Sequence, residues 1–162
     1  MRASTMTLLV VLLPGCSSAP PTDRACTLEL SGNVAESSGL GRDCATLKPS
    51  GGGYTLEIDG SSHELQALAL RFDLGATPAP GAYSPATIAG WSASALRSGD
   101  ATCILSAGAK SVPQGYFTLD LESVEARAGG VAHGSLDLVM NVHAPPATDC
   151  GAGDTEHVTL RF

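Results

Sequence analysis

The stretch Phe117-Thr118-Leu119-Asp120-Leu121-Glu122 alternates three apolar side chains with three polar ones. A β-strand points successive side chains to opposite faces, so this alternation is typical of a strand with one buried and one solvated face. Leu136, Leu138, Met140 and Val142 repeat the pattern after the loop 128–134. The two segments together predict an antiparallel β-hairpin.

Segments of similar character lie on the N-terminal and C-terminal sides of this hairpin, separated by turns rich in Gly, Pro and Ser. They comprise residues 26–30, 44–48, 54–58, 91–96, 101–106 and 158–162. Residues 37–43 and the proline-rich residues 77–85 are expected to form loops, because proline does not fit a regular helix.

Residues 63–74 are open to two interpretations. Ser61-Ser62-His63-Glu64 has the composition of a helical capping box, after which Leu65, Leu68 and Phe72 lie near helical spacing. The even-numbered residues from 68 to 74 are all apolar, however, which is the pattern of a strand. The strand is favoured because its neighbours are strands.

About nine or ten short strands without a convincing helix predict an all-β fold. We expect an antiparallel β-sandwich, with a barrel as the alternative architecture.

The N-terminal segment carries a different signal. Residues 8–13 are all apolar and lead through Pro14 and Gly15 to Cys16. This run is too short to cross a bilayer, which needs ~20 apolar residues, but it fits the hydrophobic region of a signal peptide. The stretch resembles a secretory signal that ends in the lipobox of bacterial lipoproteins. The alternative is an ordinary secreted protein with a coincidental cysteine at position 16.

The resemblance implies that residues 1–15 are removed and that Cys16 is acylated, for example with palmitate. It places the protein in the bacterial cell envelope, anchored to a membrane through the lipid on Cys16. Ser17 does not resemble the Asp of an inner-membrane retention signal, which favours the outer membrane. Residues 16–23 are rich in Ser and Pro and are expected to form a flexible tether.

The mature chain is expected to form a single domain over residues 24–162. Removal of residues 1–15 from the 162-residue chain leaves 147 residues, enough for one sizeable core. Eight basic and sixteen acidic side chains remain, for a net charge of −8. This acidic balance argues against nucleic acid as a partner and against electrostatic docking to a membrane.

Four further cysteines, Cys26, Cys44, Cys103 and Cys150, are available for disulfides in an oxidising compartment. Four cysteines allow three pairings. Cys26–Cys44 with Cys103–Cys150 is favoured, because it has the shortest loops and no crossing. A zinc site is disfavoured because no two cysteines have C-x-x-C spacing, and we expect no metal.

Catalytic motifs were sought and none is complete. Gly90-Trp91-Ser92-Ala93-Ser94 approaches a nucleophile elbow but lacks its closing glycine. The acidic segment 149–154 lacks the closing Glu of an EF-hand and is interpreted as a turn pinned by a disulfide. No P-loop or dinucleotide fingerprint occurs, so no cofactor is expected.

The remaining polar candidates have ordinary interpretations. The four histidines, His63, His133, His143 and His157, have no metal-binding spacing and are expected at strand ends or loops. The carboxylates of Asp120, Glu122 and Asp137 fit a solvated strand face. Trp91 is expected in the core, although with Tyr83 or Tyr116 it would form a small carbohydrate-binding platform.

The sequence therefore favours a non-catalytic binding or structural module that presents its loops to an envelope protein, glycan or small ligand. The alternative is an envelope hydrolase with a site built from scattered loop residues. A histidine paired with a carboxylate in a cleft would favour the enzyme. The pairs that would discriminate between the hydrolase and the binding module are His133 with Asp137, and His143 with Asp149 or His157.

Overall fold

The computed structural model describes residues 25–32, 35–88, 90–97, 103–110, 115–143 and 155–162. These residues form eleven strands, which confirms the all-β prediction. No helix in this part of the chain is long and apolar enough to cross a bilayer. The strands are β1 (Ala25–Ser31), β2 (Glu36–Arg42), β3 (Ala45–Ser50), β4 (Gly53–Gly60), β5 (Leu65–Gly75), β6 (Gly81–Tyr83), β7 (Trp91–Arg97), β8 (Ile104–Gly108), β9 (Tyr116–Val124), β10 (Ala132–His143) and β11 (Thr155–Arg161).

All strand pairs are antiparallel, and hydrogen bonds connect them into one sheet in the order β2-β1-β11-β10-β8-β7-β5-β4-β3. The long strand β10 divides this sheet, because its first part pairs with β9 and its last three residues pair with β8. Strand β6 continues the branch beyond β9.

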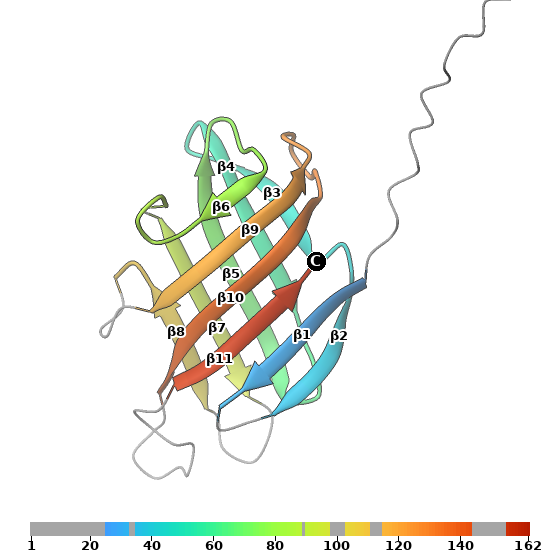
Figure 1. Cartoon of the computed structure of the whole chain (residues 1–162), viewed down its shortest axis with the longest axis vertical. Helices are drawn as coiled ribbons and strands as arrows, with labels where there is room; N and C mark the ends of the chain where they lie inside the picture. Colours follow the sequence, from blue (N-terminus) through green and yellow to red (C-terminus); the bar gives the residue numbers. More distant parts are fainter. Residues whose placement is uncertain (1–24, 33–34, 89, 98–102, 111–114, 144–154) are drawn as a thin grey trace, which may run out of the picture.

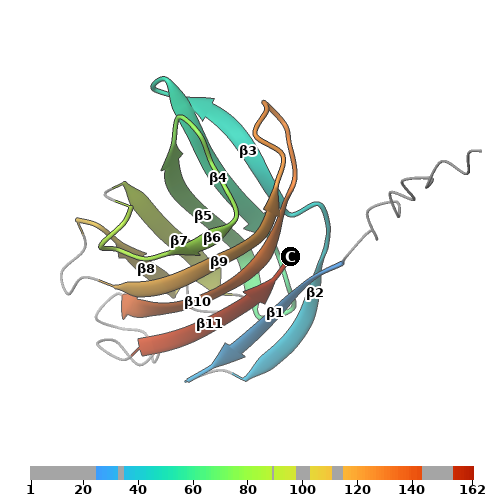
Figure 2. The same ribbon diagram turned by 45° about the horizontal axis from the view of Figure 1, so that its top comes forward.

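The sheet is curled, so that two walls face each other (Figure 1). Strands β9, β10, β11, β1 and β2 form one wall, and β3, β4, β5, β7 and β8 form the other. Figure 2 shows the same walls as parts of one curved surface. The expectation of an antiparallel all-β domain is thus confirmed, and the two walls are joined through β10 and β8.

The hydrophobic core lies between the walls. Phe117 on β9 contacts Phe72 on β5 and Trp91 on β7, with ring centroids 4.9 Å and 4.8 Å away. The apolar residues of the predicted hairpin, Phe117, Leu119, Leu121, Leu136, Leu138, Met140 and Val142, are all at most 2% exposed. The alternation that predicted the hairpin therefore reflects one face turned to this core.

Two regions expected to be loops contain strands. The prediction for residues 37–43 is wrong, because residues 36–42 form β2, whose pairing with β1 supplies its order despite a sequence rich in Ser and Gly. Within residues 77–85, Gly81–Tyr83 form the short strand β6 beside β9. Residues 65–75 form β5, so the strand interpretation of the ambiguous segment is confirmed and the helix interpretation is wrong.

The disulfide Cys26–Cys44 is present, as predicted, and joins β1 to the residue that precedes β3, with a Cα–Cα distance of 6.2 Å. Cys103 is buried and disulfide-bonded. Its predicted partner Cys150 lies outside the described residues, so the second pairing stays a prediction. The predicted signal peptide 1–15, the lipidation site Cys16 and the tether 16–23 also lie outside them.

The two ends of the strand order are modified. At one end, Thr46 on β3 pairs with Val131, and Leu47 exchanges backbone hydrogen bonds with Gly129 and Gly130. At the other end, Leu40 is an additional residue of β2 opposite the Cys26–Thr27 step of β1. Gly41 follows with a φ of 96°, a conformation that favours glycine and that is typical of a β-bulge.

Candidate functional site

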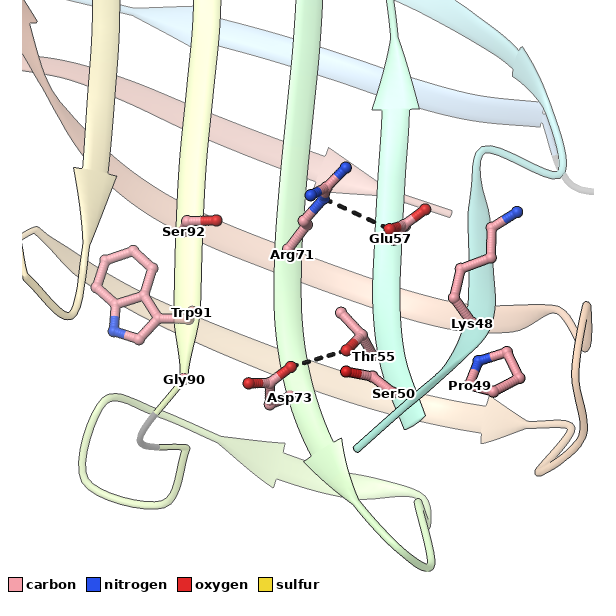
Figure 3. Close-up of a pocket in the computed structure, with 10 residues that line it drawn as sticks. All are labelled: Lys48, Pro49, Ser50, Thr55, Glu57, Arg71, Asp73, Gly90, Trp91 and Ser92. Atoms are coloured by element: carbon pink, nitrogen blue, oxygen red, sulfur yellow. Dashed lines mark hydrogen bonds and ion pairs between the residues drawn. The ribbon is translucent and has the colours of Figure 1, made fainter. Parts of the chain in front are cut away.

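A polar hollow of about 380 Å³ lies on the outer face of β3, β4, β5 and β7 (Figure 3). It is lined by Lys48, Pro49, Ser50, Thr55, Glu57, Arg71, Asp73, Gly90, Trp91 and Ser92. Figure 3 shows that the charged side chains come from three neighbouring strands and that the Trp91 ring points away from them.

Strand register explains why these residues meet. Lys48, Thr55 and Asp73 are direct cross-strand neighbours on β3, β4 and β5. Glu57 and Arg71 are neighbours in the next outward row. Side chains at alternate positions share one face, so the residues between these positions turn inward to the core. The site is therefore the polar side of the same alternation that builds the core.

The floor of the hollow is held by one hydrogen bond. The Thr55 hydroxyl donates to Asp73 Oδ1 over 2.7 Å, and Thr55 is only 8% exposed although it belongs to the outward row. A Cβ atom at Gly90 would collide with Asp73 Oδ2, so glycine at this position leaves room for the carboxylate. The backbone N–H of Asp73 also donates to the Gly90 carbonyl, over 2.9 Å. Asp73 is thus fixed from two sides.

The rim of the hollow has polar groups with spare bonding capacity. Arg71 Nε lies 3.4 Å from Glu57 Oε1, and the Arg71 side chain is 63% exposed. Within the described residues, no hydrogen bond or ion pair engages the side chains of Lys48, Ser50 or Ser92. Several donors and acceptors therefore point to one hollow without protein partners.

A second hollow of about 310 Å³ adjoins the first and shares Ser50 and Asp73 with it. Its other lining residues are Gly51, Gly52, Gly53, Tyr54, Gly75 and Ala76. We call the two hollows together the β3–β5 groove. Tyr54 lines the second hollow, and its side chain is partly buried against the core. Gly90, Trp91 and Ser92 of the incomplete nucleophile elbow line the first hollow. The charged residues of the groove were not among the predicted site residues, because each is an ordinary outward residue in the sequence.

The histidines expected to discriminate between enzyme and binding module are dispersed. Asp137 accepts a hydrogen bond from Thr159 over 2.9 Å, and within the described part of the chain no hydrogen bond or ion pair joins it to His133. His143 and His157 are exposed, on β10 and β11, and Asp149 lies outside the described residues. His63 Nδ1 lies 3.1 Å from Glu64 Oε1, but its side chain is 90% exposed. No histidine–carboxylate pair in a cleft is found among the described residues.

The structure also shows where the other predicted site residues lie. Trp91 is buried in the core, as expected, so it forms no platform with Tyr83 or Tyr116. Ser92 lies within strand β7 and not at a strand-to-helix turn. Asp120, Glu122 and Asp137 are exposed on an outer strand face, as expected. Among the described residues, no three His, Cys, Asp or Glu side chains could hold a metal, and the acidic segment 149–154 lies outside them.

A separate polar cluster is centred on Glu36 of β2. Its carboxylate accepts hydrogen bonds from Ser62 Oγ at 2.7 Å, from the His63 N–H at 3.1 Å and from the Glu64 N–H at 3.2 Å. Partial burial raises the pKa of Glu36, but these hydrogen bonds outweigh burial and hold the pKa below its usual value. The residues of the supposed capping box thus bind a carboxylate from another strand.

The Glu36 cluster links distant parts of the sheet. Glu36 begins β2, while Ser62, His63 and Glu64 form the turn between β4 and β5. We call this arrangement the Glu36 clasp. Leu40 adds an apolar contact nearby, because a Cβ at Gly60 would touch its side chain at 3.0 Å. The clasp therefore has a structural role in joining β2 to the opposite wall.

No protein-family model, curated protein or solved structure gives a significant match to this chain.

Proposed function

We propose that the protein is a lipid-anchored component of the bacterial cell envelope and acts as a non-catalytic binding module. The observation that carries the anchoring is the stretch from Leu8 to Cys16, in which a short apolar run ends at a small residue and a cysteine. Acylation of Cys16 would hold the domain at a membrane. The outer membrane is favoured, because Ser17 does not resemble an inner-membrane retention signal.

The described domain supports this proposal in two ways. The Cys26–Cys44 disulfide suits an oxidising compartment outside the cytosol. The first strand begins at Ala25, nine residues after Cys16, so a lipid on Cys16 would leave a short tether before the folded domain. Both observations fit a domain exposed at the surface of a membrane.

The binding role is supported by the β3–β5 groove. Its side chains provide donors and acceptors without protein partners among the described residues, as a ligand site requires. The dispersed histidines provide no comparable support for hydrolysis. The groove is therefore our candidate for the surface that meets a ligand.

Anchoring is tested by expressing the wild-type chain and Cys16→Ser in a lipoprotein-competent bacterium. We expect the wild type to enter the detergent phase of a phase-separation extract and the variant to remain in the aqueous phase. Mass spectrometry of the N-terminal peptide should find an acylated Cys16. Aqueous partition of both proteins, with no acylated peptide, would refute the anchoring.

A further inference from the structure

We propose that the β3–β5 groove binds an uncharged oligosaccharide with at least two sugar rings. This inference deepens the proposed function, because it names the ligand class of the candidate binding surface. It rests on the charge balance of the groove, on its composition from two adjoining hollows and on the residues that form its walls.

The first argument is charge. Lys48 and Arg71 bring two positive charges to the first hollow, and Glu57 and Asp73 bring two negative charges. An anion bound near the cations would meet two carboxylates, and a cation bound near the carboxylates would meet Lys48 and Arg71. A sugar hydroxyl both donates and accepts hydrogen bonds, so it can use both kinds of group without an unpaired charge.

The second argument is the arrangement of bonding groups. Among the described residues, Glu57 Oε1 contacts Arg71 Nε, and Asp73 accepts the Thr55 hydrogen bond through Oδ1. The Nη groups of Arg71 and the second oxygen of Asp73 are left for a ligand, together with Lys48 and Ser50. Figure 3 shows Arg71 and Asp73 on one strand and Lys48 and Ser50 on another, with Glu57 and Thr55 on the strand between them. Alternating acceptors and donors of this kind match a ring with several hydroxyls.

The third argument is shape. The two hollows have volumes of about 380 Å³ and about 310 Å³ and share Ser50 and Asp73, so each offers space for one ring of the same ligand. One ring over β4 and β5 and a second over the turn after β3 would fill both hollows.

The walls of the second hollow complete the argument. Gly51, Gly52 and Gly53 have no side chains, so a ligand can approach their backbone. A Cβ at Gly53 would lie 2.6 Å from the Gly75 carbonyl, so the close approach of these two turns depends on glycine.

The experiment uses the purified full-length chain in a detergent without sugar headgroups. Binding of maltotetraose, cellotetraose and chitotetraose is measured by titration calorimetry, alongside inorganic phosphate, glycylglycine and spermidine. We expect at least one tetrasaccharide to bind with a Kd of about 1 mM or below, and its monosaccharide to bind more weakly. The three charged probes should not bind in the groove.

Asp73→Asn tests the site with little change of shape, and we expect it to weaken tetrasaccharide binding about tenfold or more. Asp137→Asn is the matched control, because Asp137 also accepts a hydrogen bond from a cross-strand threonine but lies on the other wall. It should leave binding unchanged. If Asp73→Asn fails to fold, Lys48→Gln replaces it, since Lys48 has no hydrogen bond or ion pair among the described residues.

Three results would overturn the inference: no binding of any tetrasaccharide, equal binding by the groove variants and wild type, or tighter binding of a charged probe in the groove. Failure here is distinct from failure of the anchoring. A protein that enters the detergent phase but binds no saccharide loses only this inference. A protein that binds saccharide without acylation at Cys16 loses only the anchoring.

Discussion

Replacement of Glu36 by glutamine tests whether the Glu36 clasp stabilises the curled sheet. The carboxylate of Glu36 accepts three hydrogen bonds from the turn between β4 and β5, with two of them ending on Oε2 and one on Oε1. Glutamine keeps the length of the side chain but has a single carbonyl oxygen. Its NH₂ group would face a backbone N–H or the Ser62 hydroxyl, so at least one N–H of the turn would lose its acceptor.

The expected loss of stability follows from these contacts. A hydrogen bond to a charged group contributes about 1.5–3 kcal/mol, and an exposed pair of charges contributes less than about 1 kcal/mol. Glu36 is partly exposed, so we expect Glu36→Gln to lower the free energy of unfolding by about 1 kcal/mol near neutral pH. The β1–β2 hairpin should also exchange its amide hydrogens faster, because the clasp connects β2 to the opposite wall.

The effect should depend on pH in a defined direction. The folded-state pKa of Glu36 is lowered, so its contribution is complete above the unfolded-state value of about 4.3 and is lost as pH falls through the folded-state pKa. Glutamine does not titrate. The stability difference between wild type and Glu36→Gln should therefore shrink as the solution becomes more acidic than about pH 4.

The assay is urea unfolding of both proteins at about pH 7 and at several acidic pH values. Glu29→Gln is the matched control, since Glu29 is exposed on the neighbouring strand β1. We expect the control to change stability by less than about 0.5 kcal/mol. Equal losses for Glu36→Gln and Glu29→Gln, or a difference that does not change with pH, would refute the clasp.

Three further predictions concern the core, the disulfide and the groove. Phe117→Ala should lower the free energy of unfolding by about 3–5 kcal/mol, because the Phe117 ring is fully buried at the centre of the aromatic cluster; a loss below about 1 kcal/mol in urea titrations would contradict this. On the loop-entropy model of disulfides, the double variant Cys26→Ala/Cys44→Ala should have a free energy of unfolding about 3 kcal/mol below that of the oxidised wild type. Gly90→Ala should lower the free energy of unfolding by about 1–3 kcal/mol, because its Cβ would collide with Asp73. A melting temperature equal to that of wild type would contradict this and show that the loop adjusts freely.

Strands with one face turned to the core could be predicted from the sequence, because their alternation reports burial directly. Strands β9 and β10 are the clearest cases, because their inward residues from 117 to 121 and from 136 to 142 are large and apolar. Strand β2 has one large apolar side chain, Leu40, and owes its order to pairing with β1. A single-sequence pattern does not contain that pairing, so β2 resembles a loop.

The segment 61–64 shows a related limit. A hydroxyl followed by an acidic residue suits the N-terminus of a helix, where it binds exposed backbone N–H groups. In the structure, the backbone N–H groups of His63 and Glu64 are indeed bound by a carboxylate, but it belongs to Glu36 on a distant strand. Local composition indicated the need for a hydrogen-bond acceptor and not where it would come from.

The β3–β5 groove could not be predicted, because it depends on the register of three strands. Lys48 and Thr55 lie on the two arms of one hairpin, whereas Asp73 is 18 positions beyond Thr55, and the three become neighbours only through strand pairing. In the sequence each is an unremarkable polar residue of an alternating segment. The buried Trp91 was easier to place, because a large aromatic residue at the start of an alternating strand most often belongs to the core.

The edges of the outermost strands β2 and β3 affect whether copies of the chain can lie close together without pairing through their sheets. An unpaired strand can recruit the same strand of a neighbouring molecule, and this addition can continue into fibres. Here the hydrogen bonds of Leu47 with Gly129 and Gly130 occupy part of the β3 edge, and the bulge at Leu40 and Gly41 distorts the other end. Under the proposed anchoring through Cys16, molecules held at a membrane surface would collide frequently, and protected strand edges would help separate copies to remain folded side by side.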